Sequence, residues 1–596
     1  MKKPFPFTRM ALFLSLSCVL NACSYYFNTA PNPAVARRVE ARLVTNEGLK
    51  PESLTKTPPE SVDQALPKFS ERRAKTERSL TLEKPESPTK PKAGTEDSKP
   101  LTIAEARALA LENNLDLQIA RIDPKIAATQ VGEEEAKFDD MIFAKAKYAN
   151  KNTPALNMDV VTFTPVDPSS SLKNQAAKLT AIPQDTDTLE LEAGVVIPLR
   201  TGGKVTLSVP FDEKKQFKGV PSDQYLSALR FSISQPLLRD AGIDNNVAGI
   251  RIARYEQEAV NLRTRLQAIR VLAAIDRAYW GLYVAWGELD VRRQQYENAA
   301  DNLAMVKKRV AEGLTAAVET NRAEIGVAER MESLIVAETT LKLRQRQLKL
   351  LLNDSKLDMA SLTVVVPQTQ PTMVKFEFDR EQLARQALEG RLELLELELK
   401  LAADLTKVEY LRNQTLPLFM LDYSYSSLGR DTTSFGGAFN QTLDGDYSDW
   451  SIGMRMEYQL SNDLRRSRLE RAVQERIQRL STKQLRELTV RREIYDALDQ
   501  LSQNWQRILA ARQNVVLAGL NYDAELKQFR EGLRTMTEVL ETLTRLGEAQ
   551  LREVRSIGDY QISLVDLAFA TGTILGHSHV NMGSLANTAS KTNLPD

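Results

Sequence analysis

The residues that most often carry catalysis or bind metals are scarce in this chain of 596 residues. It holds two cysteines, Cys18 and Cys23, and two histidines, His577 and His579. A disulfide framework, a cysteine-based metal centre and a histidine-dependent catalytic triad therefore have almost no residues from which to be built. We interpret both histidines as part of a disordered C-terminal tail, residues 577–596, rather than as a metal site. The sequence thus predicts a protein that is not an enzyme and carries no cofactor and no metal.

The overall charge is almost balanced, because 79 lysines and arginines accompany 78 aspartates and glutamates, for a formal net charge of +1. A protein that binds nucleic acid through bulk charge needs a clear excess of basic residues. We therefore expect no nucleic-acid partner.

Two patterns in charge-rich helical segments suggest more specific roles. Glu538 and Glu541 are three residues apart, so both carboxylates lie on one face of a helix, although the spacing alone favours an ordinary solvated face. The triplet Glu-Gly-Leu occurs at 312–314 and again at 531–533. A glycine at a helix-to-helix turn permits a positive φ or a close approach. The leucine beside it is either a buried contact of a glycine cap or an exposed docking side chain.

The N-terminus reads as a secretion signal over residues 1–22. Three basic residues precede an apolar run from Met10 to Leu20, which is too short for a membrane span. The run ends in Leu20-Asn21-Ala22-Cys23, which resembles a bacterial lipobox, although Asn21 departs from the usual small or apolar residue. We predict that Cys23 is lipidated; the alternative is an ordinary signal peptide with an incidental cysteine.

A proline-rich segment follows, since 12 of the 25 prolines fall within the first 100 residues. Residues 45–100 are also rich in Lys, Glu, Ser and Thr. Such a composition buries too little apolar surface to order itself. We predict a disordered tether over 23–100.

Two long helices are expected to position the Glu-Gly-Leu turns. Apolar residues recur every three or four positions before each turn, which is the pattern of a coiled-coil seam. About 65 residues at ~1.5 Å each give a rod on the order of 100 Å. The seam positions are Leu289, Arg292, Tyr296, Ala299, Leu303, Val306 and Val310 in the first helix, and Ile494, Leu498, Leu501, Trp505, Ile508, Arg512, Val515, Gly519, Tyr522, Leu526, Phe529 and Leu533 in the second.

Alternating strands precede each long helix. In the second half they are 419–425 and 450–460, joined by a polar loop at 429–449. In the first half the strand 225–233 is expected to pair with about 141–149, and an added hairpin is expected at 187–212. One apolar and one polar face over about ten residues is the pattern of a membrane barrel. A half-buried soluble hairpin has the same period, so the alternation leaves both open.

The chain also repeats itself. The segment at 110–117 recurs at 387–394, and the Glu-Gly-Leu triplet occurs once in each half. The order of elements is the same in both halves, which indicates an internal duplication. The two copies of the segment lie farther apart along the chain than the two triplets do. The first half therefore contains additional material before its long helix.

This arrangement resembles the TolC-like outer-membrane efflux factor family, of the outer-membrane lipoprotein type. The similar stretches are Arg309–Leu314, Phe529–Leu533, Gln235–Leu238 and Thr571–Thr573, in the family's order. The resemblance implies a mostly α fold with membrane β-barrel strands. A duplicated unit, 101–367 and 368–576, then forms a trimeric twelve-stranded β-barrel and a long α-helical coiled-coil barrel across the periplasm.

The resemblance also implies roles for residues near the turns. Glu538 and Glu541 match acidic positions that face the pore, where the family has aspartates, and three copies would form a constriction. Arg534 and Glu319 match two members of a polar latch, and a charge-assisted bond between them would hold the closed state. Phe529 stands at the third latch position, where the family has tyrosine. The turn residues Gly313, Leu314, Gly532 and Leu533 match positions that dock an adaptor.

The function implied is a passive duct in the bacterial outer membrane, lipid-anchored and extending into the periplasm. Its partners would be two further copies, outer-membrane lipid, a periplasmic adaptor (membrane fusion) protein and an inner-membrane pump of the RND, ABC or MFS type. The alternative is a periplasmic coiled-coil lipoprotein that acts as adaptor or scaffold without a channel. Neither the cargo nor the pump class follows from the sequence.

Overall fold

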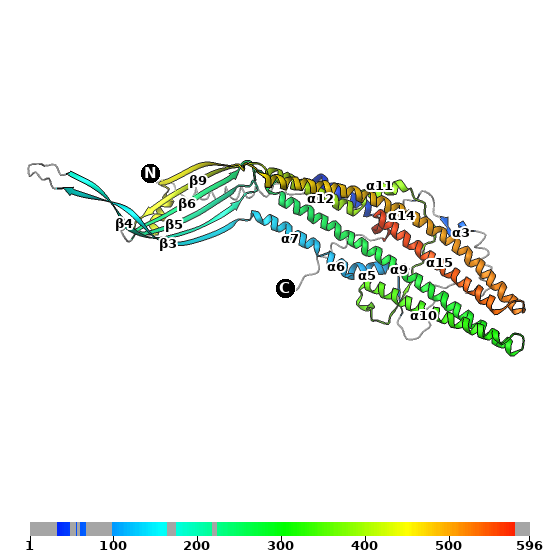
Figure 1. Cartoon of the computed structure of the whole chain (residues 1–596). Helices are drawn as coiled ribbons and strands as arrows, with labels where there is room; N and C mark the ends of the chain where they lie inside the picture. The colour runs from blue at the N-terminus through cyan, green and yellow to red at the C-terminus, as the bar shows by residue number, and fades with distance from the viewer. Residues whose placement is uncertain are drawn as a thin grey trace, which may run out of the picture. The chain divides into compact units, whose positions relative to one another are not determined.

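The computed structural model describes residues 33–47, 55, 60–66, 98–163, 174–216 and 223–578. The expected signal peptide, the expected lipidation site Cys23 and residues 579–596 of the expected tail lie outside these residues, whereas His577, the first residue of that tail, ends the helix α16 (Ile574–His577). The described chain is mostly helical with one large sheet (Figure 1). It divides into two compact units. The sheet unit comprises Ala128–Tyr255 and Ala402–Ile477, and the helical unit includes Glu256–Leu401 and the chain that follows residue 477.

The sheet unit contains one six-stranded antiparallel sheet in the order β10-β9-β6-β5-β4-β3. Figure 1 shows β3, β4, β5, β6 and β9 running side by side. The strands are β3 (Met141–Phe163), β4 (Asn174–Pro198), β5 (Lys204–Gln216), β6 (Asp223–Pro236), β9 (Leu418–Asp431) and β10 (Tyr447–Glu457).

The neighbours of β6 differ from those expected from the sequence. We expected the strand at 225–233 to pair with the strand near 141–149. In the structure β6 lies between β5 and β9, and β3 pairs with β4 instead. The added hairpin expected at 187–212 therefore forms β4 and β5 within the sheet. Because all these strands alternate in the same way, the pattern alone did not specify their order.

The segment between β9 and β10 is shorter than the loop expected at 429–449, because both strands extend into that range. It also contains a helix, α13 (Phe435–Asp444). The Ser434 side chain caps this helix by accepting a hydrogen bond from the Gly437 amide at 3.1 Å. The helix packs on β9 so closely that a Cβ on Gly429 would overlap the carbonyl oxygen of Ala438. Glycine is therefore required at position 429.

Two pairs of long helices contain the predicted turns. They are α9 (Ala248–Ala311) followed by α10 (Val318–Leu352), and α14 (Asp463–Arg530) followed by α15 (Met536–Thr571). Predicted seam residues such as Ala299, Val306, Tyr522 and Phe529 are buried in one core cluster near the turns. Leu533 is the exception, because its side chain is exposed.

Shorter elements complete the described chain, and several recur in the two halves. The helices α5 and α11 are equal in length, and their caps, Thr102 and Asp379, are separated along the chain by the same interval as the two copies of the repeated segment. The remaining elements are α2 (Pro33–Glu47), β1 (Glu60–Ser61), α3 (Val62–Ala65), β2 (Ser98–Leu101), α5 (Ile103–Asn113), α6 (Leu115–Ala120), α7 (Asp123–Glu135), η2 (Ala136–Phe138), α8 (Ile243–Asn246), η3 (Ser355–Leu357), β7 (Val364–Pro367), β8 (Val374–Lys375), α11 (Arg380–Gly390), α12 (Leu392–Gln414) and α16 (Ile574–His577).

Part of the expected tether is ordered. Within 23–100, α2 forms an ion pair between Arg42 and Glu398 at 3.2 Å, and β1 pairs with β8. Val62 is buried in a core cluster with Leu383 and Ile494. Composition averaged over a long segment did not reveal these short apolar contacts.

None of the described helices combines the length and the hydropathy of a membrane-spanning segment.

Candidate functional site at the helix turns

Each Glu-Gly-Leu triplet ends a long helix in the same hydrogen-bonded motif. In the first turn the Leu314 amide donates to the Arg309 carbonyl oxygen at 2.9 Å, and the Gly313 amide donates to that of Val310 at 3.0 Å. Gly313 has φ +73°. These two bonds and the left-handed residue define a Schellman cap, which satisfies carbonyl groups at the helix end.

The second turn repeats this geometry. The Leu533 amide donates to the Gln528 carbonyl oxygen at 2.9 Å, the Gly532 amide donates to that of Phe529 at 3.0 Å, and Gly532 has φ +79°. The side chains of Leu314 and Leu533 are not buried, with residue exposures of 63% and 75%. The two glycines thus cap the helices, and the two leucine side chains are exposed on this single chain, where a partner can contact them.

Glu319 connects the starts of the two return helices. Its side chain is buried, and its Oε2 accepts a hydrogen bond from the Met536 amide, the first residue of α15, at 3.2 Å. Its Oε1 accepts from Arg322 Nη1 at 2.6 Å. The carboxylate therefore satisfies an amide at a helix N-terminus, where a negative charge is favourable.

Arg534 does not contact Glu319 in the described chain, so the bond expected between these two latch residues is not made there. Instead Arg534 Nη1 lies 2.8 Å from Glu538 Oε1, and its Nε lies 3.0 Å from Gln528 Oε1 and 3.4 Å from Glu525 Oε2. A glutamate four residues along the chain reaches this guanidinium more directly than one on another helix.

Phe529 makes a contact that the sequence did not predict. Its ring is buried, and the Arg309 guanidinium lies 5.5 Å from the ring centroid. Arg309 Nη1 also donates to the Arg530 carbonyl oxygen at 2.8 Å. A cation–π contact and a hydrogen bond thus join α9 to α14 at a position where the resemblance has a tyrosine hydroxyl.

Both predicted constriction residues are paired with arginines on their own helix or at its start. The Glu538 carboxylate completes a capping box, because its Oε2 accepts from the Thr535 amide at 2.8 Å. This bond, together with Arg534, holds the pKa of Glu538 below its usual value. Glu541 Oε1 lies 2.6 Å from Arg545 Nη2. Each acidic residue therefore has a compensating charge four residues away.

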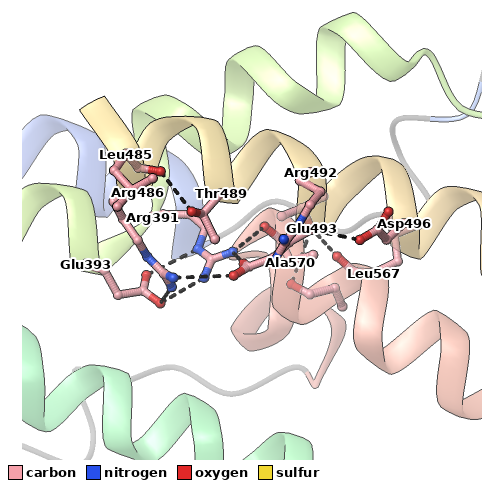
Figure 2. A network of polar contacts seen from close by, with 12 residues as sticks. Arg391, Glu393, Leu485, Arg486, Thr489, Arg492, Glu493, Asp496, Leu567 and Ala570 are labelled. Carbon is pink, nitrogen blue, oxygen red and sulfur yellow. Dashed lines mark hydrogen bonds and ion pairs between the residues drawn. The ribbon is translucent and has the colours of Figure 1, made fainter. Parts of the chain in front are cut away.

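A second polar network lies where the repeated segment 387–394 meets the end of α15 (Figure 2). The Arg391 side chain is only 3% exposed and forms ion pairs with Glu393 at 2.8 Å and with Glu493. It also donates to the Ala570 carbonyl oxygen at 3.3 Å. Arg486 reaches the same Glu393 oxygen at 3.2 Å, so two arginines and two glutamates share the cluster.

The contacts with Arg391 and Arg486 lower the pKa of Glu393. Burial on its own raises the pKa of Glu393, but the bonds and charge of Arg391 outweigh burial and lower that pKa to about 2. The carboxylate is therefore ionised at every physiological pH and remains a permanent partner of Arg391.

The first half has an equivalent contact. Asn114 holds the position in the repeated segment that Arg391 holds in the second copy, and its Nδ2 donates to the Leu351 carbonyl oxygen at 2.9 Å. Leu351 and Ala570 each lie two residues before a left-handed helix cap, Asn353 or Gly572. In both halves this position therefore binds the end of the return helix, and only the second half does so with a charged network.

The described residues contain no group of three or more potential ligands that would hold a metal ion.

Comparisons with known proteins agree with this architecture. Residues 383–573 match the family model described as outer membrane efflux protein. A search of curated proteins gave no match. A membrane protein from Pseudomonas aeruginosa is similar in structure, with a TM-score of 0.58 and 17% identity over 79% of this chain and 92% of that one.

Two structures described as outer membrane channels are also similar. One is CmeC of Campylobacter jejuni, with a TM-score of 0.56 and 15% identity over 82% of this chain and 89% of that one. The other is the open state of MtrE of Neisseria gonorrhoeae, with a TM-score of 0.54 and 13% identity over 79% of this chain and 89% of that one. Residues 383–573 thus match the outer membrane efflux protein family, and about four fifths of the chain shares the fold of TolC-like outer-membrane channels.

Proposed function

We propose that this protein is the outer-membrane channel component of a tripartite efflux or type I secretion system. In this role it is a passive trimeric duct, lipid-anchored through Cys23 and gated at its helix turns. A periplasmic adaptor and an inner-membrane pump of the RND, ABC or MFS type open it. The family match over residues 383–573 and the likeness to known channels support this function.

The observation that carries the proposal is the division of the sheet into two faces. Residues that pair directly across neighbouring strands point to the same face. One such row crosses all six strands and is entirely apolar, which is the pattern of a wall that faces lipid on one side and a polar lumen on the other. The row consists of Trp450, Tyr425, Phe231, Leu207, Val195 and Ile142.

The opposite face supports the same proposal. The parallel row one residue away is polar on four of the strands, with Ser451, Ser424, Ser232 and Thr206, and apolar on β4 and β3, with Val196 and Met141. The polar side chains of this row suit a water-filled lumen.

The gate is proposed at the turns of the helical unit. Glu538 and Glu541 would meet their counterparts from two other copies, and Arg534 would restrain Glu538 in the closed state. We expect Arg534→Ser to raise resting leakage, because Glu538 then loses its partner. Antibiotic leakage into cells and single-channel conductance measure this effect. Values equal to those of the wild type would count against a gating role for Arg534.

The test of the function is single-channel recording in planar bilayers, on detergent-extracted protein whose size is measured in parallel. We expect a trimer with discrete openings whose ion selectivity shifts away from cations in the double variant Glu538→Gln, Glu541→Gln. A monomer or dimer that never conducts, and that leaves the membrane when its lipid is removed, would favour the scaffold.

A further inference from the structure

The six-stranded sheet has two free edges, which are formed by different strands. Every residue of β10 is exposed, and positions 141–154 of β3 are exposed or half-buried. An edge strand presents unpaired amide and carbonyl groups along its outer side. In a lipid bilayer each such group must find a partner, because no water is present to replace it. A membrane-inserted sheet of this chain therefore needs a partner at β3 and another at β10.

The two edges are complementary to each other. All neighbouring strands are antiparallel and their number is even, so β3 and β10 run in opposite directions. If β3 of a second copy lay beside β10, the alternation would continue without a break. The apolar faces would also join, because Trp450 on β10 and Ile142 on β3 end the same row, with exposures of 68% and 83%.

Pairing unlike edges also leaves no edge free. Two copies that joined through β10 alone would leave both β3 strands unpaired in the membrane. A head-to-tail contact from β10 to β3 instead generates a ring when the rotation closes. The length of β10, 11 residues, fits within the exposed part of β3.

The added hairpin belongs to this wall and is not an appendage beside it. β4 pairs with β5 from Thr186 to Pro198, and β5 pairs with β6 along most of its length. Val195 and Leu207 continue the apolar row from Phe231 to Ile142. A hairpin outside the wall would instead leave β3 and β6 as neighbours.

We infer that β10 of each copy pairs with β3 of the next and that each copy contributes six strands to the closed wall. This inference rests on the trimer of the proposed function, which then has an eighteen-stranded barrel (three copies of six strands) rather than the twelve strands that the resemblance implies. Barrel diameter grows roughly linearly with strand number, so the barrel is about 1.5 times as wide, and barrels of this size leave an aqueous channel. The sheet therefore admits bulkier solutes, and the helix turns set the size limit of the duct.

The direct test is cryo-electron microscopy of the wild-type protein in lipid nanodiscs, with its copy number measured by native mass spectrometry. Eighteen strands in a trimer are the expected result. A trimer with any other number of strands in its wall would overturn the inference and leave the proposed function standing. Failure to find a trimer would overturn both, so the two failures are distinguishable.

Cysteine pairs test the strand order in intact outer membranes. Thr206 and Ser232 are direct partners on β5 and β6, so Thr206→Cys with Ser232→Cys is expected to react with a short bifunctional thiol reagent. Met141→Cys with Ser232→Cys, which joins β3 to β6 along the same cross-strand row, is the matched control and is expected not to react. Reaction of the control pair instead would place the hairpin outside the wall.

The seam between copies has its own pair. Ser451→Cys on β10, combined in one chain with Lys145→Cys or Lys147→Cys on β3, is expected to give covalent trimers that each single variant does not give. Only monomers under these conditions, from variants that still insert and conduct, would contradict a seam between β10 and β3.

Discussion

Arg391 is the clearest example of a residue whose contribution to stability depends on its burial. Its guanidinium binds Glu393, Glu493 and the last turn of α15 while almost fully buried. Removing one partner of a buried ion pair leaves an uncompensated charge, which costs about 3–5 kcal/mol. Arg486 still lies 3.2 Å from Glu393 and 3.4 Å from Glu493, so we expect Arg391→Met to cost less, about 1–3 kcal/mol, chiefly because the Ala570 carbonyl group loses its donor. The free energy of local opening, measured by hydrogen exchange of the α15 amides near Ala570, checks the prediction.

The matched control for this variant is Arg492, an exposed arginine that precedes Glu493 in the chain. Its Nε lies 3.9 Å from Asp496, and both side chains are mostly exposed, so the pair contributes less than about 1 kcal/mol. Arg492→Met is expected to leave the exchange rates near Ala570 almost unchanged. Equal effects of the two variants would show that the cluster is not a stabilising unit.

The pKa of Glu393 predicts how the same cluster responds to acid. The folded chain lowers this pKa from its usual 4.5 to about 2. Between these values the unfolded chain binds more protons than the folded one, so this contribution to stability is complete above about pH 4.5 and is lost as the pH falls toward 2. We expect the stability difference between wild type and Glu393→Gln to stay constant from pH 7 to 5 and to shrink below that. Thermal unfolding of solubilised protein at each pH measures it, and a difference that grows on acidification would refute the argument.

Among the elements, each turn holds a glycine with a structural role and a leucine with a proposed binding role. Gly532 has a left-handed backbone, which costs an alanine about 1–2 kcal/mol. Leu533 is exposed, and substitutions of exposed side chains usually change stability by less than about 0.5 kcal/mol. We therefore expect Gly532→Ala to lower stability, whereas Leu533→Ala keeps stability and impairs export with the adaptor. Thermal unfolding and drug susceptibility of cells, measured on both variants, test this pair.

Leu314→Ala at the first turn is the matched comparison, because Leu314 is exposed beside an equivalent glycine. If both leucines bind the adaptor, the two alanine variants impair export separately and more strongly together. Normal export by the double variant would remove the docking role from both turns.

The elements also show what the sequence was able to predict. Apolar spacing in the long helices located the seams, and the Glu-Gly-Leu triplets located both caps, because these features depend on neighbours in the chain. The partner of β6 depended on a choice among strands with the same alternation, and that choice is made by tertiary structure.

The expected bond between Glu319 and Arg534 was carried over from a resemblance in which aspartate occupies position 538. Glutamate is longer by one methylene, and its carboxylate reaches both the Thr535 amide and Arg534.

At the scale of the whole molecule, pairing within each copy sets the charge of the proposed constriction. Three copies of Glu541 alone would form a carboxylate ring that attracts cations and hinders anions. In this chain Glu541 has Arg545 at 2.6 Å, and both side chains are exposed, so the ring that three copies would form in the proposed trimer has a nearly balanced charge. The ion selectivity of the duct is therefore expected to be weaker than that of a ring of free carboxylates.

This balance predicts opposite effects of two single substitutions. Arg545→Ala leaves three uncompensated carboxylates at the constriction, so it should increase selectivity for cations. Glu541→Gln leaves three arginines instead and should shift selectivity toward anions. The reversal potential across a potassium chloride gradient in planar bilayers measures both shifts, and the effect should weaken at high salt because exposed charges are screened. If neither substitution moves the reversal potential while conductance persists, the narrowest charged point of the duct lies away from Glu541.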